Sequence, residues 1–165
     1  MITVKEAIVV AFLQALSPAQ PQIDKHEVMC LAEIIDTEAR GESFIGKVGA
    51  GFVLRKRITE EPEYYGKSYC DVLRNKVKGV RTLPWISNPP YKKWDDKAKE
   101  SYEDTVEVAT HIILDLVTID PTNGAKYFSN PKKDQGRFFR DGLRTGKLVI
   151  TAKIDNHLFY QEVKK

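Results

Sequence analysis

The spacing of the apolar residues changes once along this chain, and this change is the strongest constraint on its fold. Up to residue 117 the apolar residues recur mainly every three or four positions, the period of a helix that is buried on one side. After Gly124 the pattern changes to short runs rich in β-branched and aromatic residues, which are typical of strands. The sequence therefore predicts an α+β domain that is mainly helical, with a small antiparallel β-sheet toward the C-terminus.

The expected elements follow from this periodicity together with capping residues and prolines. Helices are predicted over residues 4–16, 25–40, 44–58, 68–77 and 95–117, and strands over residues 126–129, 148–153 and 158–163. Asp24 is placed to cap the second helix and Gly41 to end it. Three glycines weaken the third helix but would allow a neighbouring helix to pack closely against it. Residues 79–94 hold three prolines and are expected to form an extended loop.

The length and composition fit one globular domain. Residues 1–22 are expected to form an N-terminal helix and connector, and residues 23–165 the core of this 165-residue chain. The chain is 42% hydrophobic and 30% charged, and we expect a monomer. Its net charge of +3 slightly favours an anionic partner such as a cell wall or nucleic acid, but many ordinary proteins share such a charge.

The N-terminus has only a faint likeness to a signal peptide. The apolar run at residues 7–13 is short, Glu6 interrupts the positive region before it, and no cleavage site stands out. No stretch is long enough to span a membrane. We therefore expect synthesis in the cytoplasm without a signal peptide.

The two cysteines, Cys30 and Cys70, each lie in a helical pattern of their own. Neither stands in a Cys-x-x-Cys or Cys/His spacing of the kind that binds zinc. We therefore expect both to be reduced, buried and unbridged, and the protein to need no metal ion or cofactor.

One glutamate has a position that suits acid catalysis. The apolar residues of the helix 25–40 gather on one arc at about 100° per residue, namely Val28, Leu31, Ala32, Ile35 and Ala39. Glu38 lies at the edge of that arc, whereas Glu33 is expected to face water. Partial burial raises the pKa of a carboxyl group, as a general acid near neutral pH requires. From the pattern alone, a structural Glu38 paired with a basic residue such as Arg40 is the more common case.

Four blocks of sequence, in order, resemble the cell-wall hydrolase family typified by the spore cortex-lytic enzyme SleB. They are residues 37–42 with 46–48 and 52–54, residues 70–73, residues 120–125 with 127–131, and residues 154–160. The chain departs from the family at residues 55–57, Arg-Lys-Arg, where an Asn-Arg pair is usual. Residues 82–85 only loosely match the family but keep Trp85. A catalytic domain of this size standing alone looks similar to a phage-encoded lysin.

The resemblance implies a lysozyme- or transglycosylase-like fold and cleavage of peptidoglycan between N-acetylmuramic acid and N-acetylglucosamine. In a lytic transglycosylase Glu38 would act first as acid and then as base, and the muramyl 6-hydroxyl would attack C1 to give a 1,6-anhydro product. A hydrolytic muramidase would instead use water and a second carboxylate, for which Asp71 and Asp155 are the first candidates.

A second glutamate is the alternative acid. Glu42-Ser43-Phe44 resembles the Glu-Ser-x-aromatic signature of another transglycosylase family. We favour Glu38 because Gly41 is expected to end the helix and to leave Glu42 less securely buried.

The resemblance also suggests residues that contact the glycan, namely Tyr127, Phe128, Asn130, His157 and Trp85. Each has a structural alternative: the aromatic residues would belong to the core, Asn130 would shape the turn before Pro131, and His157 would be a buried structural histidine. Two other classes of function remain. A non-catalytic wall-binding or virion protein would need an altered acid, and nucleic-acid binding is not expected because residues 55–57 and 92–93 match no reader motif and fit solvated helix ends.

Overall fold

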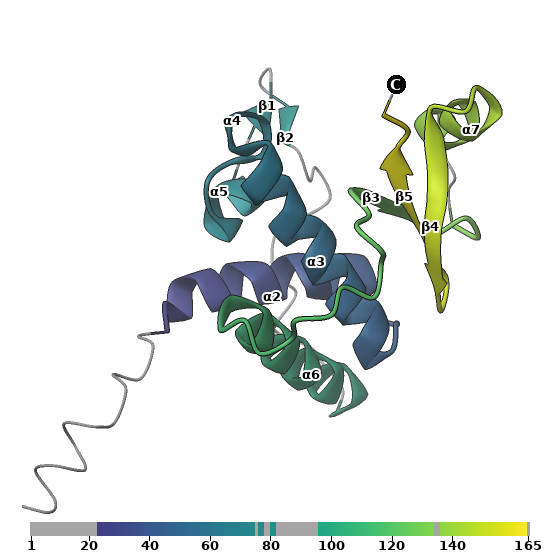
Figure 1. Ribbon diagram of the computed structural model, residues 1–165. Coiled ribbons are helices and arrows are strands. Elements are labelled where there is room, and N and C mark those ends of the chain that lie inside the picture. Colours follow the sequence, from purple (N-terminus) through teal and green to yellow (C-terminus); the bar gives the residue numbers. More distant parts are fainter. Residues whose placement is uncertain (1–22, 75, 78–79, 82–95, 134–135, 165) are drawn as a thin grey trace, which may run out of the picture.

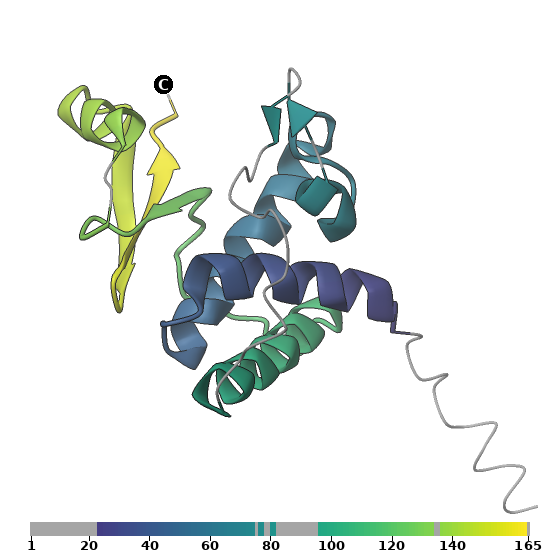
Figure 2. The same cartoon turned by 180° about the vertical axis from the view of Figure 1, so that it is seen from behind.

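Three helices form the main body of the protein, and a small sheet lies beside it (Figures 1 and 2). The computed structural model describes residues 23–74, 76–77, 80–81, 96–133 and 136–164. The predicted helix at residues 4–16 and most of the loop predicted at residues 79–94, including Trp85, lie outside the described residues. Helix α2 (Lys25–Ala39) packs against both α3 (Phe44–Glu60) and α6 (Asp96–Ile113), and these two also contact each other. The expected α+β fold, mainly helical with a small antiparallel sheet, is confirmed.

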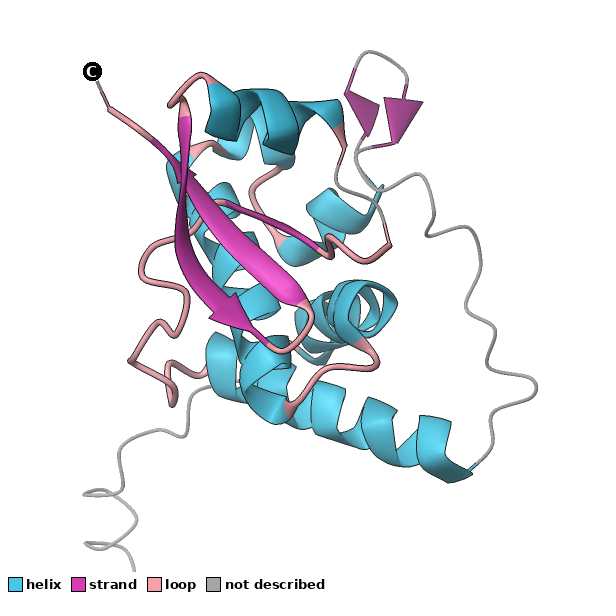
Figure 3. Cartoon of the chain, turned by 90° about the vertical axis from the view of Figure 1, so that its right-hand side faces the viewer, coloured by secondary structure: helices cyan, strands magenta, loops and turns pink. Residues whose placement is uncertain are grey.

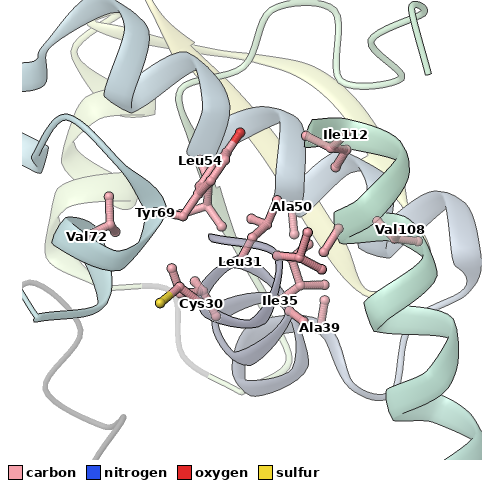
Figure 4. Packing of buried hydrophobic residues seen from close by; sticks show 14 of the residues in the cluster. Cys30, Leu31, Ile35, Ala39, Ala50, Leu54, Tyr69, Val72, Val108 and Ile112 are labelled. Carbon is pink, nitrogen blue, oxygen red and sulfur yellow. The ribbon is translucent and has the colours of Figure 1, made fainter. Parts of the chain in front are cut away.

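The start of α2 and its buried face are as the sequence predicts. Asp24 caps the helix by accepting hydrogen bonds from the backbone N–H groups of His26 (2.9 Å) and Glu27 (3.3 Å). Figure 4 shows Leu31 and Ile35 of this helix close to Ala50 and Ile112, which come from α3 and α6. The face of α2 that carries the apolar arc is therefore the face that forms the core, and it fixes the orientation of the rest of the helix.

Two glycines of α3 allow close packing, as expected. A Cβ atom at Gly51 would lie 2.2 Å from Cδ1 of Ile112, and one at Gly49 would lie 2.9 Å from Cζ of Phe159. Distances this short are far inside van der Waals contact, so α6 and the sheet approach α3 closely only because these positions lack a side chain. Helix α3 is thus the element on which both α6 and the sheet rest.

The expectation of unbridged cysteines is wrong. Cys30 of α2 and Cys70 of α5 (Tyr69–Arg74) form a disulfide, with their Cα atoms 5.0 Å apart. A helical pattern considered one helix at a time could not show this, because the two residues meet only when α5 packs on α2. The disulfide closes a loop of 40 residues and ties α5 to the helix that carries Glu38.

The connection from α3 to α6 contains more structure than was predicted. A short helix α4 (Pro62–Tyr65) precedes α5, and α5 ends at Arg74 rather than continuing to residue 77. Strands β1 (Lys76–Val77) and β2 (Val80–Arg81) then pair antiparallel. Helix α6 ends before residue 117 because the chain turns at Asp115, which has a positive φ of 55°.

The C-terminal sheet has three antiparallel strands in the order β3, β5, β4 (Figure 3). These are β3 (Tyr127–Ser129), β4 (Leu148–Ile154) and β5 (His157–Glu162). Tyr127 pairs with Tyr160 across β3 and β5, and a register shift interrupts the β4–β5 ladder between Ile150 and Ala152. A helix that the sequence did not predict, α7 (Arg137–Arg144), packs on β4. Among the described residues no helix is long and apolar enough to cross a membrane.

Candidate active site

Glu38 lies in the last turn of α2, half-buried, within electrostatic range of an arginine of α3. That arginine is Arg57, and burial lowers the pKa of its guanidinium. The neighbours that oppose this shift, in decreasing order of effect, are Tyr65, Glu38, Tyr127 and Glu61. A carboxylate, a guanidinium and two phenols from four separate elements therefore share one small region.

The Arg57 guanidinium is held from several sides. Its Nε donates a hydrogen bond to the carbonyl oxygen of Lys126 (2.9 Å), just before β3. Its Cζ lies 5.2 Å from the centre of the Tyr65 ring and 5.8 Å from that of the Tyr127 ring, both within the range of cation–π interactions. The expectation that residues 55–57 form a solvated helix end is therefore wrong for Arg57. This side chain joins α3, α4 and the sheet.

Tyr127 of β3, a predicted glycan-binding residue, lies beside this arginine. Its hydroxyl donates a hydrogen bond to Oε1 of Glu162 (3.0 Å), and its ring meets the Phe138 ring edge-on at 5.1 Å. Burial raises the pKa of the Tyr127 phenol, and the hydrogen bond to Glu162 raises it further. Both effects favour the neutral phenol, and the Tyr127 ring lies next to the Arg57 cation.

Glu42, the alternative acid, is much more buried than its sequence position suggested. Its side chain is only 6% exposed, and its carboxylate accepts hydrogen bonds from the backbone N–H (3.0 Å) and the Nδ2 amide (3.2 Å) of Asn156. One of its oxygens also lies 3.6 Å from Nδ1 of His157. The expectation of a loosely buried Glu42 is wrong because the β4–β5 turn, more than a hundred residues away in sequence, covers it.

A second pair of residues, Ser43 and Asp155, adds to this contact between the α2–α3 turn and the β4–β5 turn. The backbone N–H and the hydroxyl of Ser43 both donate to Oδ2 of Asp155, at 2.8 and 2.6 Å. Asp155 is therefore engaged in holding the α2–α3 turn, and His157 is brought to Glu42. Burial lowers the pKa of His157, and the nearby Glu42 opposes this shift. Glu42, Asp155 and His157 therefore all lie at the contact between the α2–α3 turn and the β4–β5 turn.

The structure also places four other residues considered from the sequence. Phe128 packs into the core, with its ring 5.8 Å from that of Phe159. Asn130 accepts a hydrogen bond from the backbone N–H of Lys132 (3.1 Å), as a turn-forming asparagine does. Asp71 accepts one from the backbone N–H of Lys67 (3.1 Å). Glu33, expected to face water, is half-buried, and this burial raises its pKa.

A pocket of about 510 Å³ lies elsewhere on α3 and contains none of the predicted site residues. It is lined by Phe52, Arg55, Lys56, Thr59, Glu60, Asp115, Val117, Thr118 and Asp120. Arg55 is paired there with Asp115 (2.5 Å) and Lys56 with Glu60 (3.1 Å). These charges are already paired with each other, so the region around Glu38 and Arg57 remains the stronger candidate.

Sequence reasoning missed two members of the site, Arg57 and Tyr65. The signal for Arg57 was present, because residues 55–57 fall where the resembled family has its Asn-Arg pair. Tyr65 follows Pro62 at the end of a four-residue helix, which is too short for a periodic pattern to reveal.

Comparisons with known proteins give two matches. The model of the cell wall hydrolase family matches residues 41–160, a span that includes Glu42 and begins three residues after Glu38. The chain also resembles the solved catalytic domain of the germination-specific lytic transglycosylase SleB from Bacillus anthracis, with a TM-score of 0.52 and 19% identity over 86% of this chain and 98% of that one. At this identity the likeness concerns the fold. No curated protein matches the chain.

Proposed function

Because this chain belongs to the cell wall hydrolase family, we propose that it is a lytic transglycosylase that cleaves peptidoglycan between N-acetylmuramic acid and N-acetylglucosamine, with Glu38 as general acid and base. The observation that carries the assignment of Glu38 is its place beside Arg57, which is held between Tyr65 and Tyr127. We propose further that it is a phage-encoded lysin that acts on the bacterial wall.

The proposed reaction needs one carboxyl group that works twice. Glu38 donates its proton to the glycosidic oxygen as the bond from that oxygen to C1 of the muramyl residue breaks. The muramyl 6-hydroxyl oxygen then bonds to C1, and its proton passes to the Glu38 carboxylate, which restores the acid. Because the nucleophile belongs to the substrate, its attack on C1 is intramolecular and no water has to be positioned.

Arg57 has a defined part in this cycle. Glu38 is negative only between the two proton transfers, and a fixed cation nearby stabilises that form without reorganisation. Removing the positive charge of Arg57 would therefore disfavour the Glu38 carboxylate that exists between the two proton transfers. This stabilisation needs an Arg57 guanidinium that keeps its position during the reaction. The rings of Tyr65 and Tyr127 and the carbonyl oxygen of Lys126 hold it in place.

Two observations favour Glu38 over Glu42. The carboxylate of Glu42 already contacts Asn156 and His157 and is nearly closed to solvent, which disfavours the approach of a sugar oxygen. Glu38 is half-buried and therefore both partly desolvated and reachable. A hydrolytic muramidase is the alternative reaction, but Asp71 and Asp155 are engaged in backbone contacts that shape a turn and hold the α2–α3 connection.

The product decides between these reactions. Purified peptidoglycan is digested, reduced with borohydride and analysed by mass spectrometry. We expect 1,6-anhydromuramyl ends, about 20 daltons lighter than the reduced muramyl ends of a hydrolytic route. Predominantly reducible ends would mean that water is the nucleophile, and a non-catalytic wall-binding or virion protein would release no fragments.

A further inference from the structure

The positive charge of this chain is concentrated at its C-terminal end. Residues 126–165 hold ten Lys and Arg residues against four Asp and Glu residues, a net charge of +6. Residues 1–125 hold 16 basic and 19 acidic residues, a net charge of −3. The modest +3 of the whole chain therefore conceals a cationic unit made of the sheet and α7 and an acidic unit made of the helices.

Helix α7 presents three arginines of this cationic unit on one face. Arg137, Arg140 and Arg144 follow one another at intervals of three and four residues, so they share a face of the helix, and all three are exposed. We call them the arginine stripe. Within the described residues the only ion pair of the stripe is that of Arg144 with Asp141, at 3.6 Å and largely exposed on both sides.

The other faces of α7 fix the stripe toward solvent. The Phe139 ring packs 4.8 Å from that of Tyr160, and a Cβ atom at Gly142 would lie 2.5 Å from Cδ1 of Leu148. Helix α7 therefore lies tightly against the sheet with one defined rotation. In Figure 1 it lies on the side of the sheet away from α2, α3 and α6.

The stripe continues directly from the candidate active site. Phe138, next to Arg137 and 52% exposed, has its ring 5.1 Å from that of Tyr127, which in turn lies beside Arg57. A glycan strand that contacts Tyr127 would thus meet Phe138 and then the arginines. An exposed aromatic residue between a sugar site and a row of cations suits a polymer that carries both sugar rings and regularly spaced anions.

We propose that the arginine stripe of α7 binds the carboxylates of the stem peptides on the peptidoglycan strand held at Glu38. The proposal rests on the function proposed above and adds the part of the substrate that this surface recognises. Guanidinium groups match the planar geometry of carboxylates, and several in a row act together on a polymer that repeats its charges. A single exposed pair contributes little, so the effect depends on the whole stripe.

The test measures binding to insoluble peptidoglycan by co-sedimentation. All proteins carry Glu38→Gln, so that the polymer stays intact. The test variant adds Arg137→Gln, Arg140→Gln and Arg144→Gln, and the matched control adds Lys25→Gln, Lys97→Gln and Lys99→Gln, which remove the same charge from the exposed surface of α2 and α6. We expect apparent affinity to fall about tenfold in the test variant, to change little in the control, and to depend less on salt once the stripe is removed. Equal binding of test and control variants would overturn the proposal.

Two modified substrates identify the source of the anions. On peptidoglycan whose stem peptides have been removed by an amidase, the test variant and its parent should bind equally. On peptidoglycan stripped of phosphate polymers by hydrofluoric acid, their difference should persist. A difference that survives on bare glycan, or that vanishes with the phosphate polymers, would assign the stripe to another ligand and contradict the proposal.

A separate measurement keeps this proposal distinct from the proposed function. In the chain with Glu38 intact, the three α7 substitutions should leave cleavage of soluble, peptide-free glycan unchanged. If the parent chain cleaves no glycan at all, the proposed reaction is wrong, while the binding comparison still decides whether the stripe recognises peptide carboxylates.

Discussion

Nδ1 of His157 lies 3.6 Å from a carboxylate oxygen of Glu42, and both side chains are less than a tenth exposed. This contact supports different roles for the two glutamates in the reaction proposed above. The Glu42 carboxylate, enclosed by a histidine and an asparagine, joins two turns, whereas the half-buried Glu38 carboxylate near Arg57 is the one that we propose for proton transfer.

Replacing Glu38 tests the acid. Glu38→Gln removes the transferable proton with little change of shape, so we expect lysis of purified peptidoglycan to fall on the order of 10²–10⁴-fold with the fold intact. Glu33→Gln is the matched control, since Glu33 is a half-buried glutamate of the same helix, and it should keep nearly full activity. Turbidity loss of peptidoglycan suspensions and thermal melting of each variant give the two readouts.

Replacing Glu42 should affect stability rather than chemistry. Glu42→Gln leaves an amide where Asn156 and His157 offer donors, and an unsatisfied buried group costs about 1–3 kcal/mol. We expect a lower midpoint in urea unfolding and activity per folded molecule within a few-fold of the parent. A folded but inactive Glu42→Gln variant, together with an active Glu38→Gln variant, would move the acid to Glu42.

Arg57 should be required for the pH dependence of the reaction. Because the interaction between Arg57 and Glu38 is mutual, the cation favours the ionised carboxylate. Because Glu38 must be protonated to act as the acid, its ionisation sets the alkaline limb of the pH–activity profile, so Arg57→Gln should lower kcat and move that limb to higher pH. Arg57→Lys keeps the charge and should restore the position of that limb, although only part of kcat.

The control for Arg57 is Arg55→Gln, which removes an arginine of the same helix that pairs with the exposed Asp115. Its pH–activity profile should match that of the parent. If the Arg55 and Arg57 variants shift the profile equally, the effect is one of net charge, and Arg57 has no special relation to Glu38.

The pH dependence of folding follows from His157. Its pKa in the folded protein lies below the ordinary value of 6.5, so the unfolded chain binds the proton more readily. This contribution to stability is complete above pH 6.5 and is lost as the pH falls below it. The free energy of unfolding should drop between pH 7 and pH 5, and the drop should be smaller in His157→Gln but unchanged in His111→Gln. Equal drops in all three proteins would show that His157 does not cause the effect.

The disulfide should contribute measurably to stability. Cross-linking two residues 40 positions apart restricts the unfolded chain by roughly 4 kcal/mol at most, and measured values are commonly about 2–4 kcal/mol. Reduction, or Cys30→Ser with Cys70→Ser, should lower the thermal midpoint. Alkylation of the unfolded chain without reductant should add no label and leave a mass two daltons below that of the dithiol. Labelling of both thiols would contradict the bridge.

The sequence was informative where local rules decide the structure. Asp24 caps α2 because its side chain reaches N–H groups two and three residues away, and the apolar arc of that helix follows from its period alone. The three strands of the sheet were likewise visible as short β-prone runs. Such features depend on neighbours within a few positions, which a single sequence displays.

The features that were missed depend on distant partners. Cys30 meets Cys70 only through the packing of α5 on α2, and Arg57 is half-buried beside residues of α4 and β3. Helix α7 is a different case, since its arginines and its Phe138-Phe139 pair are amphipathic over just eight residues between two β-prone runs. The burial of Glu42 was missed for two reasons. Gly41 suggested that the helix ends before Glu42, and the β4–β5 turn that covers Glu42 lies more than a hundred residues later in the sequence.

The hydrogen bonds between the α2–α3 turn and the β4–β5 turn also determine when the candidate site becomes ordered during synthesis. Ser43 and Glu42 are bound by Asp155 and Asn156, residues 112 and 114 positions later in the chain. Contacts of such long range form only after a large loop closes, and a growing chain cannot form them until Asp155 and Asn156 have left the ribosome. Until then Glu42 lacks its partners, and the α2–α3 turn next to Glu38 is not fixed. A protein that acts on the wall would in this way gain an ordered site only after the β4–β5 turn has been synthesised.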